Sequence, residues 1–97
     1  MKPPDDIIVL ALRAITGEVT GAMPAIGFGY SGNFAKFLFY MEKPPTEYDR
    51  ENAEIIAVNF DSGHLTKLEQ IDVEFVVTEE PFGKLDFLDF CIFGRSE

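Results

Sequence analysis

Apolar residues recur at helical spacing near the start of this chain. Positions i, i+3, i+4 and i+7 are occupied by Ile8, Ala11, Leu12 and Ile15. This spacing is typical of a helix that buries one side. Asp5 or Asp6 is suited to cap its first turn, and Gly17 is a natural stop. We therefore predict a helix over about residues 6–16.

The same spacing returns in the middle of the chain, where it marks a second helix. The apolar positions there are Ala53, Ile56, Ala57 and Phe60. Thr46 follows two prolines and is a good N-cap, while Glu47 and Asp49 suit the positive end of a helix dipole. Residues 61–63, Asp-Ser-Gly, should end the helix. We predict a helix over residues 47–60.

Between the two helices, the pattern changes to the alternation expected of a β-hairpin. In residues 26–30, Ile and aromatic side chains share one face and two glycines occupy the other. Residues 31–33, Ser-Gly-Asn, form the predicted turn. The second strand, Phe34 to Met41, has apolar residues of both parities, interrupted only by Lys36. Such a strand is expected in the centre of a sheet, with both faces covered.

Two further strands are predicted after the second helix, over residues 68–78 and 85–93, with a proline-containing turn between them. The short turns favour antiparallel pairing, so the last two strands should form a hairpin. The expected fold is a single α+β domain spanning residues 1–97, of αββαββ order, with a mainly antiparallel four-stranded sheet packed by two helices. The predicted core includes Phe37, Phe39, Ile56, Phe60, Ile71, Val73 and Phe75.

The last predicted strand contains a repeated Leu-Asp-Phe, which places Asp86 and Asp89 three residues apart. Successive side chains of a strand point to opposite faces, so a regular strand would turn one of these acids toward the core. A bulge near Leu88 would restore both acids to one face. Alternatively, regular pairing begins only near Leu88, which leaves Asp86 in the turn. The second arrangement needs less special geometry and is preferred.

The net charge of the chain limits the kinds of molecule that it is expected to bind. The chain has 17 acidic and 8 basic residues, a net charge of −9. Coulomb repulsion opposes binding to nucleic acid or to an anionic membrane, so we expect neither as a partner. Seven acids lie between residues 69 and 89, where Lys84 is the only base. Of these seven, the predicted partner-binding residues are Asp72, Glu74, Glu79, Glu80, Asp86 and Asp89. The alternative is that they form ordinary solvated faces.

A second group of acids, Glu47, Asp49, Glu51 and Glu54, lies on the second predicted helix. The first three favour the N-terminal turn of any helix, and Arg50 is an i, i+4 partner of Glu54. These acids therefore need no function beyond stabilising the helix.

No set of residues with catalytic spacing is evident. His64 is the only histidine and is interpreted as a solvated loop residue. Cys91 is the only cysteine, which excludes an intramolecular disulfide and a cysteine-based metal site, and it should pack as a small hydrophobe. We expect no cofactor and no metal. No signal peptide or membrane span is apparent, so the cytoplasm is the expected compartment.

Several segments together carry a resemblance to a known group of proteins. They are "ALRAITGEV", "FLFYMEKPPTEYDRENAEIIAVNF", an "IDVEF" strand and an ending in Arg-Ser-Glu. In this pattern the chain is similar to small acidic immunity proteins of bacterial contact-dependent growth inhibition and related polymorphic toxin systems. The resemblance covers nearly the full length, and it implies a protein that neutralises a toxin domain, often a nuclease, by binding it.

Three functions follow as hypotheses. The leading one is an immunity protein that binds a basic toxin domain and occludes its active site. The alternative is a non-enzymatic regulatory or structural protein-binding module. The third is a small enzyme that uses carboxylates such as Asp72, Glu74 and Asp89; it would require these acids to converge in a pocket.

Overall fold

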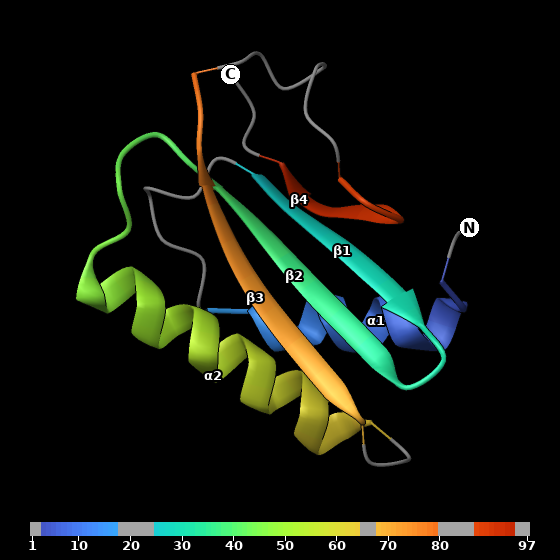
Figure 1. Cartoon of the computed structure of the whole chain (residues 1–97). Helices are drawn as coiled ribbons and strands as arrows, with labels where there is room; N and C mark the ends of the chain where they lie inside the picture. Colours follow the sequence, from blue (N-terminus) through green and yellow to red (C-terminus); the bar gives the residue numbers. More distant parts are fainter. Residues whose placement is uncertain (1–2, 18–24, 65–67, 80–86, 95–97) are drawn as a thin grey trace.

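The computed structural model describes residues 3–17, 25–64, 68–79 and 87–94. The elements are α1 (Asp5–Ile15), β1 (Ala25–Ser31), β2 (Phe34–Met41), α2 (Glu47–Gly63), β3 (Gln70–Val77) and β4 (Phe90–Gly94). The predicted αββαββ order is confirmed (Figure 1). The boundaries differ from the prediction mainly at α2, which continues to Gly63, and at β4, which begins at Phe90.

The sheet is mixed, with strand order β3-β2-β1-β4. β1 pairs antiparallel with both β2 and β4, whereas β2 and β3 are parallel. The prediction of a mainly antiparallel sheet was therefore wrong, as was the predicted hairpin of the last two strands. The connection through α2 returns the chain to the end of the sheet where β2 began, so β3 runs alongside β2 in the same direction. β4 then lies at the opposite edge.

Both helices cover one face of this sheet (Figure 1). The predicted core residues Phe37, Phe39, Ile56 and Phe60 are fully buried between the sheet and the helices, as expected. The corresponding β3 residues, Ile71, Val73 and Phe75, are only half-buried, although they pack against the same cluster. The helix layer therefore covers the middle of the sheet better than its β3 edge.

The start of α1 differs from the prediction. Its N-cap is Pro4, without a side-chain cap, and Asp5 and Asp6 lie inside the first turn, where they favour the helix dipole. The buried stripe includes Ala14 in place of Leu12, which is 41% exposed. Leu12 lies four residues after Ile8 and Ala14 lies three residues after Ala11, so both fit helical spacing, and only the contact with the sheet decided which side is buried.

The start of α2 is a complete capping box. Thr46 Oγ1 accepts a hydrogen bond from the backbone N–H of Asp49 at 3.2 Å, and the Asp49 carboxylate accepts one from the backbone N–H of Thr46 at 2.9 Å. Asp49 is buried as a result. It belongs to the cap rather than to the charged surface of the helix.

The open face of the sheet, which no helix covers, has a smaller apolar cluster of its own. Ala25, Leu38 and Tyr40 are buried there, with Val76 and Phe87 packed against them. Because β2 contributes buried residues to both faces, its predicted central position is confirmed. Phe87, shortly before β4, lies over β1.

Gly27 has no room for a side chain under this cover. A Cβ atom there would lie 2.8 Å from backbone atoms of Phe87. We expect Gly27→Ala to lower the free energy of unfolding by about 1–3 kcal/mol, as overpacking does elsewhere, measured by urea denaturation. Gly29→Ala is the matched control, because its Cβ would meet the Leu88 side chain at 3.3 Å, and that side chain can move. Equal losses in the two variants would contradict this account.

Candidate functional site

Residues 87–89 form a tight turn over β1 that leads into β4. Leu88 has a φ of 63°, in the left-handed region that non-glycine residues rarely adopt. On either side of it, Phe28 N–H donates to the Phe87 carbonyl at 3.2 Å, and Asp89 N–H donates to the Phe28 carbonyl at 3.1 Å. Leu88 forms only an isolated bridge with Phe28, and the regular pairing of β4 with β1 begins at Cys91. The choice between the two arrangements of the Leu-Asp-Phe repeat stays a prediction. Asp86 lies outside the described residues.

Asp89 is half-buried and has a structural contact. Its carboxylate accepts a hydrogen bond from the backbone N–H of Tyr30 at 2.9 Å. A buried or half-buried N–H needs such a partner, and a charged acceptor gives a stronger bond than a neutral one. One acid of the repeat therefore anchors the turn to β1.

Asp89→Ala is expected to lower the free energy of unfolding by about 1–3 kcal/mol, because the Tyr30 N–H loses its charged acceptor. Thermal and urea denaturation measure the loss. Asp72→Ala is the control: Asp72 is exposed and accepts hydrogen bonds from the exposed Gln70 amide, so we expect a change within about 0.5 kcal/mol. If Asp89→Ala left the free energy of unfolding unchanged, the hydrogen bond from Tyr30 would not stabilise the turn.

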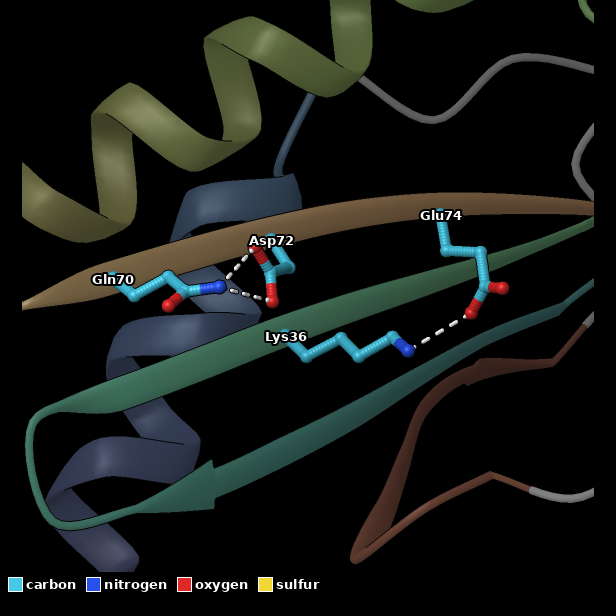
Figure 2. Close-up of polar contacts among 4 residues, drawn as sticks. All are labelled: Lys36, Gln70, Asp72 and Glu74. Atoms are coloured by element: carbon cyan, nitrogen blue, oxygen red, sulfur yellow. Dashed lines mark hydrogen bonds and ion pairs between the residues drawn. The ribbon is translucent and has the colours of Figure 1, made fainter.

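The acids of β3 lie on the open face beside one base. Lys36 Nζ lies 2.9 Å from the Glu74 carboxylate, and Gln70 Nε2 donates to both carboxylate oxygens of Asp72 at 2.9 Å (Figure 2). Hydrogen bonding and Coulomb attraction by Glu74 raise the pKa of Lys36, which keeps this base charged. The ion pair is exposed to water and contributes little to stability. The donor to Asp72 is a neutral amide and Lys36 interacts with both Asp72 and Glu74, so one base faces two carboxylates and this part of the face stays acidic.

We call Asp72 and Glu74 the β3 acids; both are exposed, as is Glu79, which lies two residues after the end of β3. Asp72 and Asp89 line one shallow hollow of about 460 Å³, together with Lys36 and Leu88. They meet there because residues 87–89 lie over β1, not because β4 adjoins β3. The other two predicted binding residues, Glu80 and Asp86, lie outside the described residues.

Lys36 and His64 make contacts that were not predicted from the sequence. Lys36 was noted only as an interruption of an apolar strand, yet the parallel register places it opposite Asp72 and next to Glu74. His64 was interpreted as a solvated loop residue, which was wrong. It is half-buried at the end of α2, and its Nε2 lies 2.7 Å from the Tyr30 hydroxyl. Nothing in the sequence spacing of His64 and Tyr30 indicates that they are in contact.

The three carboxylates considered for catalysis do not all line one pocket among the described residues. Within the described ranges, no group of three or more His, Cys, Asp or Glu residues is placed to hold a metal ion. Asp72, Glu74 and Asp89 contact Gln70, Lys36 and the Tyr30 backbone, and Glu74 is not among the residues that line the hollow. Burial raises the pKa of the Cys91 thiol, which donates to the Phe93 carbonyl at 3.3 Å. No helix in the described part of the chain is long and apolar enough to cross a membrane.

Curated proteins include no match to this chain. A protein-family model described as "MafI2 immunity protein" matches residues 4–97, which is nearly the whole sequence. That match confirms the resemblance to immunity proteins of polymorphic toxin systems. This acidic chain, with two helices on one face of a mixed sheet, thus belongs to the MafI2 immunity protein family.

Proposed function

We propose that this protein neutralises a cognate toxin domain by binding it and covering its active site. The observation that carries the proposal is the family match over residues 4–97. Proteins of immunity families generally act without catalysis of their own, and the contacts of the carboxylates on the open face fit a binding surface. Covering the active site is the simplest way for a small domain to block an enzyme that it binds.

The contact surface of the toxin is basic in this proposal. The protein has a net charge of −9, and the exposed β3 acids form part of that charge. Complementary potentials speed encounter and disfavour wrong partners. A nuclease fits this chemistry well, since an enzyme that binds phosphates must present positive charge around its active site. An acidic protein would then cover the same surface that holds the substrate.

The test uses the toxin domain that we expect the gene next to that of this protein to encode. The two proteins are produced together, purified by a tag on the toxin, and the toxin is assayed with and without an equimolar amount of the partner. We expect a stable complex, loss of toxin activity, and competition between this protein and the toxin's substrate. Failure to form a complex would reject toxin neutralisation, and a complex that retains activity would reject occlusion of the active site.

A further inference from the structure

The outer edge of β3 has backbone groups that no other described strand pairs. β3 is the last strand of the sheet on its side, adjacent to β2 alone. Gln70 and Thr78 donate their N–H groups to the carbonyls of Asn33 and Met41, at the two ends of the β2 pairing. Backbone groups alternate in direction along a strand, so the even-numbered residues of β3 face β2. The N–H and C=O groups of Ile71, Val73, Phe75 and Val77 therefore face outward.

The side chains of those same four residues are incompletely covered. Ile71, Val73 and Phe75 are half-buried against the main core, and Val77 is 49% exposed. In contrast, the β2 residues Phe37 and Phe39, which have the same facing, are fully buried. A further strand beside β3 would extend this apolar layer, because side chains that are directly opposite on paired strands lie on the same face.

Both sides of this edge are acidic. Asp72 and Glu74 lie on the open face (Figure 2), and along β3 they alternate with the apolar residues of the helix side. On the helix side, the Arg50 guanidinium lies 5.6 Å from the centre of the Phe75 ring, which shows which side of α2 faces β3. Glu54 and Asp61 lie four and eleven residues after Arg50, on that same side of the helix, and both are exposed. Lys36 and Arg50 offset only part of this charge.

We infer that the outer edge of β3 binds an extended segment of the toxin as an additional β-strand. The inference rests on the proposed function and specifies the surface that carries it. The segment alternates apolar residues, which pack with Ile71, Val73 and Phe75, and Lys or Arg residues, which lie beside Asp72 and Glu74. Strand addition of this kind takes affinity from backbone hydrogen bonds and specificity from alternate side chains.

A second copy of this chain is a poor occupant of the same edge. Pairing of two β3 strands would bring Asp72 and Glu74 of both copies onto one face, where like charges on paired strands destabilise the sheet. Exposed acids on an edge strand are a common protection against such self-pairing. A basic strand reverses the sign of the same interaction. Charge therefore selects the toxin segment over a homodimer.

Amide hydrogen exchange tests the inference residue by residue, with the catalytically inactivated toxin domain of the adjacent gene as the probe. In the free protein, Asp72, Glu74 and Val76 should exchange slowly, because their N–H groups face β2, and Ile71, Val73 and Phe75 should exchange fast. On binding, we expect the exchange of the odd-numbered amides to slow at least tenfold. Only the odd-numbered amides can respond, because the even-numbered ones are already bonded to β2, and a toxin bound at another face would leave them exchanging fast. The variants Val73→Pro and Val73→Ala separate backbone pairing from simple coverage of this edge.

The outcomes separate this inference from the proposed function. A toxin that binds and is inhibited, while the odd-numbered amides exchange as in the free protein, overturns strand addition alone. A toxin that does not bind overturns the proposed function, and strand addition with it. Slowing of the odd-numbered amides with rising concentration of this protein alone would assign the edge to a second copy instead.

A substitution pair gives an independent test. Val73→Pro removes one outward N–H and leaves the β2 pairing intact, since proline is tolerated on the free side of an edge strand. Val73→Ala removes most of the same side chain but keeps the N–H. We expect Val73→Pro to weaken toxin binding at least tenfold more than Val73→Ala, with circular dichroism confirming the fold of both. Equal affinities of two folded variants would contradict pairing at this edge, and the exchange experiment decides the question if Val73→Pro does not fold.

Discussion

Replacing Phe60 by alanine is expected to lower the free energy of unfolding by about 3–5 kcal/mol, the range for truncating a buried aromatic residue. Phe60 is fully buried at the centre of the helix–sheet interface. Its ring centre lies 5.3 Å from that of Phe28 and 5.5 Å from that of Phe37, so the cavity would open among large rings that cannot collapse into it. Urea denaturation followed by circular dichroism measures the loss.

Val58→Ala is the matched control on the same helix. Val58 lies two residues before Phe60 but is 62% exposed, so its truncation removes apolar surface that is already in water. We expect a change within about 0.5 kcal/mol. A loss of less than about 1 kcal/mol for Phe60→Ala would mean that α2 is held to the sheet by something other than this aromatic cluster.

Reversing Asp72 and Glu74 together to lysine is expected to slow association with the toxin domain at least tenfold, a typical scale for electrostatic steering. Both side chains are exposed on the open face, so the fold should survive their replacement. Stopped-flow or surface-binding kinetics at two salt concentrations measure the effect. The difference from the unmodified protein should shrink at high salt, because exposed charges are screened.

The control reverses Glu47 and Glu51 on α2, which are also exposed. Each double reversal adds four units to the net charge of −9, so both variants have a net charge of −5 and differ only in where the charge lies. Asp49 is unsuitable for this control because it is buried in the capping box. If the α2 variant associates slowly while the β3 variant does not, the toxin binds another face. If neither variant responds and salt has no effect, the acidity serves solubility alone.

Local features of the fold could be predicted from sequence because each depends on residues close together in the chain. The α2 stripe Ala53, Ile56 and Phe60 and the Thr46 cap lie within one helix, and both are present. The β1–β2 hairpin closes through a two-residue connection, and the burial of its alternating residues followed from period-two spacing. The family resemblance was likewise carried by contiguous segments, and the family model confirms it.

The candidate site was accessible from sequence only in part. The exposure of Asp72 and Glu74 followed from their alternation with apolar residues in β3. The role of Asp89 did not, because its partner Tyr30 lies 59 residues away in the chain. The contact of His64 with Tyr30 and the ion pair of Lys36 with Glu74 likewise join residues distant in sequence. No local pattern could assign these partners.

By itself, then, the sequence determined the type, order and buried faces of most elements, since helix and strand periodicity mark which side of each segment leaves water. The tertiary structure alone decided which strands are neighbours. An apolar row of period two fits beside any strand that offers a matching face, so it cannot choose between a β3–β4 hairpin and the observed order β3-β2-β1-β4. That choice depends on how α2 packs across the sheet, and it leaves β3 at the edge with its outward backbone groups available for a partner.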